Sequence, residues 1–351
     1  MRILMIAPPW LTVPPVAYGG IELIVSALSD GLVEAGHDVT LVASGGSKTR
    51  ARLKRVFDVP PFEHLGDARI EAVHALSAYL GRADYDIIHD HTMAVGPALA
   101  VLSDHPPVVH TLHHPWSDAQ VRLARLVSSR VHLVAISRDQ AARAPRDIPI
   151  AGVVHNGIPV ERYPFRGAKE RFLLFVGRAS PDKGPEAAID VAERLGRPLV
   201  IGIKINEPSE HRYWRETLQP LIEASSVRVD VVPNPEHERK VDLMSRAAAV
   251  LMPIQWPEPF GLVMAEANAC GTPVVAYAVG AAPEIIINGR SGFLVEPGDL
   301  DGYCAAVERA ATLDPRECRR HIVAHFSAQR MVAGYEQVYR QAAGELAAIA
   351  V

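Results

Sequence analysis

Residues 2–44, RILMIAPPWLTVPPVAYGGIELIVSALSDGLVEAGHDVTLVAS, predict the class of fold. The apolar run 2–7 is short and is followed by prolines, which is typical of a buried strand. Residues 21–35 place apolar side chains at helical spacing, and Gly36 follows, the residue type that often caps a helix C-terminus. Residues 38–44 form a second apolar run. A strand, a helix and a strand within about forty residues indicate a βαβ unit and therefore a parallel sheet.

The alternation of strands and helices occurs twice along the chain. Residues 156–170, NGIPVERYPFRGAKE, are rich in Pro, Gly and charge, and a new strand begins at about residue 171. We therefore predict an α/β protein with two Rossmann-like, doubly wound parallel-sheet domains, 1–165 and 166–327. Two such domains would face each other across a cleft and bind ligands at the carboxyl ends of their strands. A final helix is expected from about residue 328.

The composition excludes several classes of protein. A chain of 351 residues fits two domains, and its formal net charge of -4 gives no electrostatic footprint for nucleic acid. The three cysteines are widely spaced and form neither a disulfide framework nor a zinc pattern. The apolar run at the N-terminus is too short for a signal peptide, and no run approaches the roughly 18 residues that span a bilayer. We expect a cytoplasmic protein without a transmembrane segment.

Two glutamates eight positions apart flank a predicted loop and the start of a helix. Glu258 lies in QWPEPF, which follows the strand AVLMPI and is stiffened by prolines. The backbone N–H groups of Phe260, Gly261 and Leu262 would form a helix N-terminus suited to phosphate or hydroxyl oxygens. Glu266 lies one turn further on, where its carboxylate could accept hydrogen bonds from ribose hydroxyls. The alternative is that Glu258 caps the helix and Glu266 lies on the surface.

Other loops at strand ends carry cations and glycines. Arg178 and Lys183 lie in GRASPDKG, where a guanidinium fork and an ammonium could converge on a diphosphate. The alternative is two solvated loop cations. Gly19 and Gly20 would permit close approach of the backbone to a phosphate, or would serve as a hinge before the helix.

Several histidines follow strands of the first predicted domain. HDH suggests a metal hydrolase, but no Asp- or Glu-rich motif with metal spacing follows, so we predict no metal site. His113, at a strand end, is expected to donate a hydrogen bond to a polar substrate. Asp84 and Asp86 resemble a metal-binding Asp-x-Asp but precede a strand. The histidines that follow strands of the first predicted domain are His89, His91, His110, His113 and His114.

The basic segment Lys48 to Arg55, KTRARLKR, is expected to be a solvated helix face. The alternative is a contact with anionic lipid or a charged acceptor, which would be a peripheral contact with a membrane.

The motifs GGIE, TLHH, VVHNGIPVERY, GRASPDKG and the block 258–299 resemble, in this order, the retaining glycosyltransferases of family four, which have the GT-B fold. The resemblance implies transfer from a nucleoside-diphosphate sugar, with UDP the first choice and GDP and ADP behind it, without a metal or other cofactor. It also implies that the terminal helix packs back on the first domain. Residues 278–286, AVGAAPEII, depart from the Gly-Gly often found before Pro-Glu, a change expected to touch no functional role.

The resemblance also implies roles for single residues. Glu258 would contact the donor sugar and Glu266 the ribose, with the backbone of Phe260 to Leu262 at the sugar and phosphate. Arg178 and Lys183 would neutralise the diphosphate, Gly20 would approach it from the other domain, and His113 would contact the transferred sugar near the reacting carbon.

Three other functions are alternatives to a glycosyltransferase. A nucleotide-sugar epimerase of the same fold would place acid and base carboxylates in the cleft, and a non-catalytic binding protein would have lost Arg178, Lys183 or Glu258. A nicotinamide dehydrogenase would have Gly-x-Gly-x-x-Gly after the first strand, and this chain has APPWLTVPPVAYGG. The expected partners are the nucleotide sugar and a small-molecule, glycan or lipid-linked acceptor. The sequence predicts neither the identity of that acceptor nor the oligomeric state.

Overall fold

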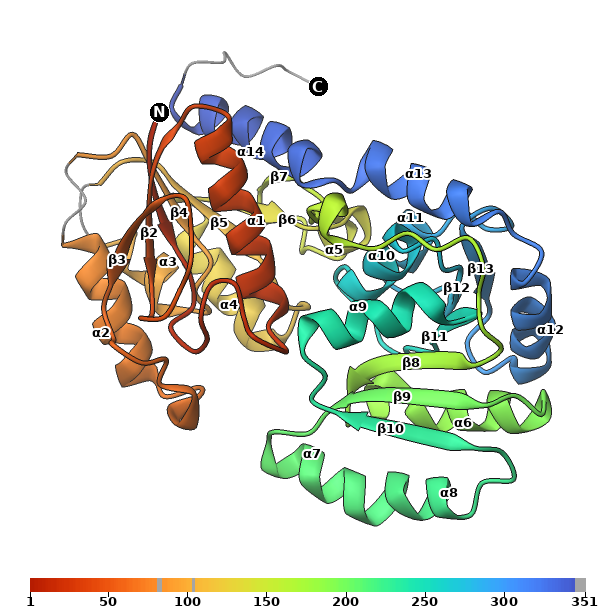
Figure 1. The fold of residues 1–351 in the computed structure, drawn as a ribbon. Coiled ribbons are helices and arrows are strands. Elements are labelled where there is room, and N and C mark those ends of the chain that lie inside the picture. The colour runs from red at the N-terminus through yellow and green to blue at the C-terminus, as the bar shows by residue number, and fades with distance from the viewer. Residues whose placement is uncertain (81–83, 103–104, 345–351) are drawn as a thin grey trace. The chain divides into compact units, whose positions relative to one another are not determined.

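A computed structural model describes residues 1–80, 84–102 and 105–344 (Figure 1). The chain forms two compact units. Unit 1 contains Met1–Ile158 and the C-terminal helix α14 (Ala328–Ala342), and unit 2 is Pro159–Ser327. The boundary lies between Ile158 and Pro159, a few residues before the position predicted from composition.

Unit 1 is built on a seven-stranded parallel sheet with the order β3-β2-β1-β4-β5-β6-β7. The strand order reverses at β1, which pairs with both β2 and β4, so the sheet is doubly wound. The strands are β1 (Arg2–Ile6), β2 (Asp38–Ala43), β3 (Arg52–Arg55), β4 (Ile87–Asp90), β5 (Val108–Leu112), β6 (Val131–Ala135) and β7 (Ile150–Val153). The helices that precede α14 are α1 (Gly20–Glu34), the 3-10 turn η1 (Phe62–His64), α2 (Ala68–Tyr79), α3 (Val95–Leu99), α4 (Asp118–Val127) and α5 (Arg138–Ala142).

Unit 2 is also built on a doubly wound parallel sheet, which has six strands in the order β10-β9-β8-β11-β12-β13. Here the order reverses at β8, which pairs with both β9 and β11. The strands are β8 (Leu173–Arg178), β9 (Leu199–Lys204), β10 (Val229–Pro233), β11 (Ala249–Met252), β12 (Val274–Tyr277) and β13 (Gly292–Val295). The α-helices are α6 (Pro185–Arg194), α7 (Pro208–Tyr213), α8 (Gln219–Glu223), α9 (His237–Arg246), α10 (Leu262–Ala269), α11 (Ala282–Ile285), α12 (Leu300–Ala310) and α13 (Pro315–His325). The 3-10 turns are η2 (Val160–Arg162) and η3 (Pro181–Lys183), and η4 (Trp214–Leu218) is a π-helix. The predicted fold class is confirmed.

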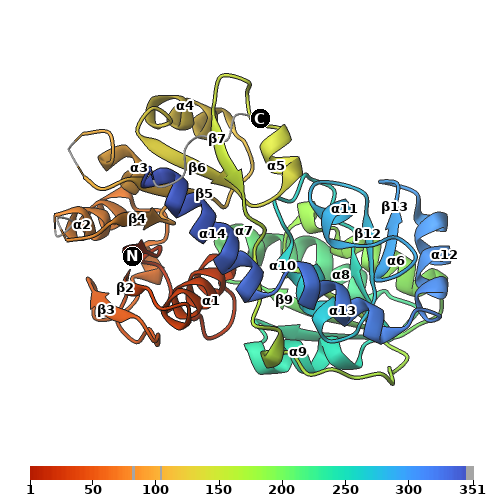
Figure 2. The ribbon, with the colours of Figure 1, turned by 90° about the horizontal axis from the view of Figure 1, so that it is seen from above.

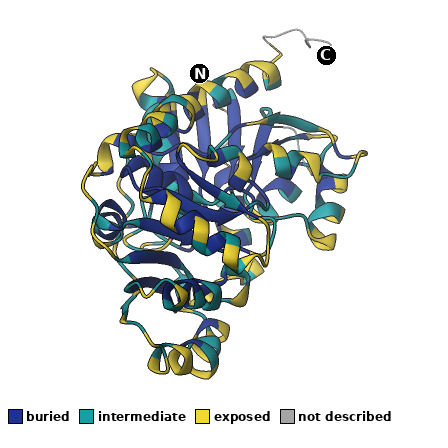
Figure 3. Ribbon diagram, turned by 90° about the vertical axis from the view of Figure 1, so that its right-hand side faces the viewer, coloured by how far each residue is buried: buried dark blue, intermediate teal, exposed yellow. Residues whose placement is uncertain are grey.

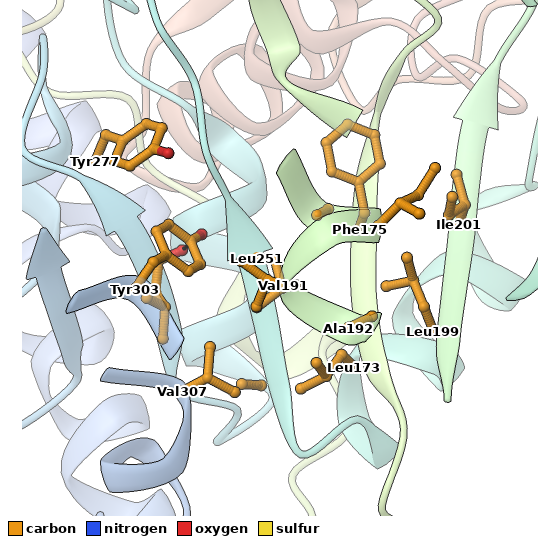
Figure 4. Packing of buried hydrophobic residues seen from close by; sticks show 14 of the residues in the cluster. Leu173, Phe175, Val191, Ala192, Leu199, Ile201, Leu251, Tyr277, Tyr303 and Val307 are labelled. Atoms are coloured by element: carbon orange, nitrogen blue, oxygen red, sulfur yellow. Dashed lines mark hydrogen bonds between the residues drawn. The ribbon is translucent and has the colours of Figure 1, made fainter. Parts of the chain in front are cut away.

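The central strands of each sheet are buried, whereas the edge strands β3, β7 and β10 are partly or largely exposed, and the helices expose one face (Figure 3). In unit 2, Leu173, Phe175 and Leu251 from the sheet belong to one buried cluster with Val191 of α6 and Tyr303 of α12 (Figure 4). The Tyr303 hydroxyl accepts a hydrogen bond from Met252 N–H at 3.0 Å, so its polar end is satisfied inside this core. This packing fixes β8 and β11, whose carboxyl ends lead into the loops with the predicted site residues.

Helix α14 follows unit 2 in sequence but packs against α1 and β5 of unit 1 (Figure 2). The apolar stripe of this helix is buried: Met331, Tyr335, Val338 and Tyr339 are all in the core. The Tyr335 hydroxyl lies 2.7 Å from Thr111 Oγ1, and the Tyr339 hydroxyl lies 2.6 Å from His89 Nδ1. The helix therefore completes unit 1, as the family resemblance implied.

The expectation of a helix at Lys48 to Arg55 is wrong. Residues Arg52–Arg55 form β3, which pairs in parallel with β2 at the edge of the sheet. An edge strand tolerates charged side chains because one of its sides faces water. Consistent with this, Arg52, Leu53 and Arg55 are exposed.

Candidate functional site

The loops after β8 and β11 bring three predicted site residues to the same end of the unit 2 sheet. The two strands are neighbours and parallel, so their carboxyl ends meet at one edge. The Lys183 ammonium forms an ion pair with the Glu258 carboxylate, and its Nζ lies 4.7 Å from the centroid of the Trp256 ring. Both charged side chains are mostly buried, with exposed fractions of 13% and 18%. The ion pair is therefore mostly buried, and a small part of each side chain stays in contact with water.

Arg178 is held more loosely than Lys183. Its guanidinium lies 3.4 Å from the carboxylate of Asp182, and about a third of each side chain is exposed. The two loops are also tied through their backbones, because Gln255 N–H donates to the Asp182 carbonyl at 3.2 Å. The two predicted cations thus belong to one connected pair of loops.

Helix α10 begins where the sequence predicted. Gly261 is its N-cap and has φ 87°, a left-handed conformation that favours glycine. A Cβ at this position would lie 2.3 Å from Met264 Cε, the end of a flexible side chain that can move aside, so the backbone conformation is the reason for glycine. The helix opens with Leu262, and its first turn reads Leu-Val-Met-Ala. The glycine cap and these apolar residues supply no carboxylate that would neutralise the positive partial charge of the helix N-terminus, and binding of a ligand there stays a prediction.

The side chain of Phe260 serves the core and not a ligand. It is 2% exposed, and its ring packs edge to face on Phe326 with the centroids 5.9 Å apart. This contact anchors the loop that carries Glu258.

Glu266 is almost completely buried, with an exposed fraction of 1%. Lys240 Nζ, on α9, donates to both carboxylate oxygens at 2.7 and 2.9 Å, and the Tyr163 hydroxyl donates to Oε1 at 3.0 Å. The alternative of an ordinary surface glutamate is therefore wrong. Neither Lys240 nor Tyr163 was predicted as a partner of Glu266. Tyr163 ends the motif VVHNGIPVERY, but it lies 103 residues before Glu266 in the chain, and Lys240 belongs to none of the quoted motifs. The ribose-binding role of Glu266 stays a prediction.

The segment AVGAAPEII packs against Glu258. Ala281 N–H donates to the Glu258 carbonyl at 3.0 Å. Gly280 has φ 60°, and a Cβ there would lie 2.5 Å from the Glu258 nitrogen and 2.6 Å from its oxygen. Ala281 itself has φ −79°, an ordinary value for alanine, so this position requires no glycine. The segment therefore holds the backbone of a predicted site residue, and the expectation that its departure from Gly-Gly touches no functional role stays a prediction.

In unit 1, His113 follows β5 and pairs with a second histidine. His113 Nε2 lies 2.8 Å from Nδ1 of His91, which follows the neighbouring strand β4. Burial, and then the neighbouring histidines, hold the pKa of His113, His91 and His89 well below the usual range. All three rings are therefore neutral at neutral pH. His113 was predicted from the sequence as a site residue, but its contact with His91 was not.

Of the two glycines at the start of α1, Gly19 has a packing role. Gly20 opens the helix and Gly19 is its N-cap. A Cβ on Gly19 would lie 2.7 Å from Pro15 Cβ and 2.9 Å from Leu11 Cδ1, so the loop itself requires glycine at this position. Binding of phosphate by Gly19 and Gly20 stays a prediction.

The Asp-x-Asp motif has a structural explanation. Asp86 accepts hydrogen bonds from both the backbone and the guanidinium of Arg2 at 2.8 Å. Within residues 1–80, 84–102 and 105–344, no group of three His, Cys, Asp or Glu side chains is placed to hold a metal ion. In the same part of the chain, none of the helices is both long and apolar enough to cross a membrane.

Comparisons with known proteins show the family to which the chain is similar. Residues 162–324 match the family model Glycosyl transferases group 1, and residues 18–162 match Glycosyltransferase Family 4. The chain is 29% identical to a glycogen synthase of Mycobacterium tuberculosis, over 97% of this chain and 94% of that protein. It is 28% identical to a D-inositol 3-phosphate glycosyltransferase of Xylanimonas cellulosilytica, over 92% of each chain.

The fold of the chain is also found in solved structures. AviGT4, a glycosyltransferase involved in avilamycin A biosynthesis, matches with a TM-score of 0.74 and 27% identity over 99% of both chains. The fold, the site and these relatives define a glycosyltransferase with the GT-B fold. More narrowly, the chain belongs to the glycosyltransferases of the family-four type.

Proposed function

We propose that this glycosyltransferase moves a sugar, with retention of configuration and without a metal, from a nucleoside-diphosphate sugar to a hydroxyl acceptor. UDP is the first choice of nucleotide. The observation that carries the proposal is that two cations and a carboxylate lie at the ends of adjacent strands. Arg178 ends β8, Lys183 lies in the loop after it, and Glu258, which pairs with Lys183, lies in the loop after β11. A diphosphate leaving group needs fixed positive charge, and the sugar needs hydrogen-bond acceptors.

Departure of the nucleoside diphosphate builds negative charge on its phosphates. Arg178 would meet that charge through its guanidinium fork, and Lys183 would meet it as a point charge. The backbone N–H groups of Gly261 and Leu262 would add the dipole of α10. Charges fixed before the reaction stabilise the transition state without reorganising, which is what a reaction without a metal requires.

The remaining roles belong to the sugar, the ribose and the acceptor. In this proposal Glu258 and His113 contact the transferred sugar, and Glu266 holds the ribose. We propose no covalent enzyme nucleophile, in contrast to retaining glycosidases with two carboxylates. The departing phosphate would instead take the proton of the acceptor hydroxyl on the face where the new bond forms. Gly20 of unit 1 would approach the diphosphate.

The acceptor is not assigned. The names of the relatives point to two different chemical classes, a glucan and an inositol phosphate. The proposed compartment is the cytoplasm, which agrees with the free state of all three cysteines in the structure.

A thermal-shift panel of UDP, GDP, ADP and their sugar derivatives, in EDTA and in Mg²⁺, tests the proposal. A ligand at about 100 times its Kd adds roughly 2.7 kcal/mol to the free energy of unfolding. We expect one nucleotide series to stabilise the protein equally in both buffers. Stabilisation that needs Mg²⁺ would overturn the metal-independent mechanism, and conversion of a UDP-sugar to its epimer without acceptor would favour an epimerase.

A further inference from the structure

Three side chains of unit 1 form a hydrogen-bonded row across neighbouring strands. Met5 lies on β1, His91 follows β4 and His113 follows β5, and β4 pairs with both other strands. The Met5 sulfur lies 3.1 Å from His91 Nε2, and His91 Nδ1 lies 2.8 Å from His113 Nε2. Met5 is completely buried, and His91 is 1% exposed. The first two members of the row are therefore fixed by the core.

The chemistry of the row permits one consistent arrangement of protons. A thioether sulfur has lone pairs and no proton, so the nitrogen facing it must donate. A neutral imidazole has one N–H, so a proton on His91 Nε2 leaves a lone pair on His91 Nδ1. That lone pair accepts the Nε2–H of His113. The opposite arrangement would place two lone pairs against each other at the sulfur.

We propose that Met5 and His91 fix His113 as its Nε2–H tautomer, so that Nδ1 of His113 presents a lone pair to the ligand. His113 then accepts a hydrogen bond from a hydroxyl, whereas the sequence analysis expected it to donate one. Met5 and His91 are positioning residues, because they act through His113. The assignment of that hydroxyl to the donor sugar rests on the proposed function, whereas the assignment of the tautomer does not.

His89 provides an internal comparison. Its ring lies 4.1 Å from that of His91, centroid to centroid, but its nitrogens bond elsewhere. Nδ1 lies 2.6 Å from the Tyr339 hydroxyl and Nε2 lies 2.8 Å from Thr111 Oγ1. A change at Tyr339 should therefore alter the protonation of His89 and leave the row from Met5 to His113 intact.

The test is a two-bond ¹H–¹⁵N correlation spectrum of the full chain labelled with ¹⁵N-histidine at neutral pH. His113 is assigned by the loss of its signals in His113→Gln. We expect His113 Nε2 to be protonated and Nδ1 to be unprotonated. Met5→Leu keeps the volume of the side chain but removes the sulfur acceptor, so the pure tautomer should become a mixture. Tyr339→Phe, the matched control, should leave the His113 signals unchanged.

Binding measurements connect the tautomer to the sugar. If half of the Met5→Leu molecules hold the wrong tautomer, the Kd for UDP-glucose should rise roughly twofold while the Kd for UDP stays constant. A wild-type spectrum with the proton on His113 Nδ1 would overturn the proposal even if Met5→Leu does not fold. Unchanged His113 signals in a folded Met5→Leu protein would also overturn it. Failure of UDP-glucose to bind the wild type would count against the proposed function alone.

Discussion

Replacing Glu258 with Gln should strengthen the binding of bare nucleoside diphosphate. In the structure Lys183 is paired with Glu258, so a diphosphate must compete with that carboxylate for the ammonium. The amide in Glu258→Gln keeps the shape of the side chain but not its charge. Lys183 would then be released, with the face of Trp256 still 4.7 Å from its Nζ.

The size of the effect follows from the burial of the pair. A hydrogen bond to a charged group contributes about 1.5–3 kcal/mol. Exposed fractions of 13% and 18% let water reach both charges, so we take the lower end of that range. About 1.5 kcal/mol corresponds to roughly tenfold tighter binding of UDP. Turnover of the complete donor should fall in the same variant, because Glu258 is proposed to contact the sugar.

Titration calorimetry with UDP measures this effect, and a double-mutant cycle assigns it. Lys183→Ala should weaken UDP, and adding Glu258→Gln to Lys183→Ala should change nothing further, because the cation to be released is absent. Asp182→Asn is the matched control: it removes a carboxylate 3.4 Å from Arg178 and should have a smaller effect. Equal or weaker UDP binding by Glu258→Gln in a folded protein would show that the ion pair does not compete with the nucleotide.

Three further predictions concern packing and buried ionisable groups. Gly280→Ala should reduce both stability and donor turnover, because its Cβ would clash with the Glu258 backbone. The control Gly196→Ala, at φ 57° with open space around the Cβ among the described residues, should lose only about 1 kcal/mol of stability, and equal turnover in both variants would contradict the proposed contact. Burial raises the pKa of Glu22 to about 7 from 4.5, so the buried charged carboxylate destabilises the folded state increasingly as pH rises through that interval. Glu22→Gln should therefore raise the unfolding free energy, measured by urea titration, by up to about 3 kcal/mol above pH 7 and by little below pH 4.5. Burial lowers the pKa of His74 to about 4 from 6.5, so the unfolding free energy falls as pH falls from 6.5 to 4. His74→Gln should reduce that loss of unfolding free energy by up to about 3 kcal/mol, and an unchanged dependence on pH would show that His74 titrates normally.

The sequence predicted most of the fold because each strand is a short apolar run next to a helix with a recognisable start or end. Gly36 and Gly196 follow helices α1 and α6 with positive φ, and Pro185 opens α6, as their residue types suggest. The error at Lys48 to Arg55 has a physical reason. An edge strand needs apolar character on only part of its surface, so a charged strand and a solvated helix look alike in sequence.

The candidate site was predicted less completely than the fold. Residues in loops at strand ends, such as Lys183 and Glu258, were found because the topology of a parallel sheet brings such loops together. Their ion pair, and the hydrogen bonds from Lys240 to Glu266 and from His91 to His113, depend on side-chain contacts between distant segments. No local pattern of residues encodes such contacts.

The placement of α14 in unit 1 has a consequence for synthesis of the chain. Ribosomes release the N-terminus first, and domains commonly fold in that order. Unit 2 is continuous in sequence and can be complete while α14 is still inside the ribosome. Unit 1 must wait, because the buried partners of His89 and Thr111 are Tyr339 and Tyr335. The second unit to be synthesised is thus the first that can finish folding, and a chain stalled before residue 328 would expose the unpaired core of unit 1 to proteases and chaperones.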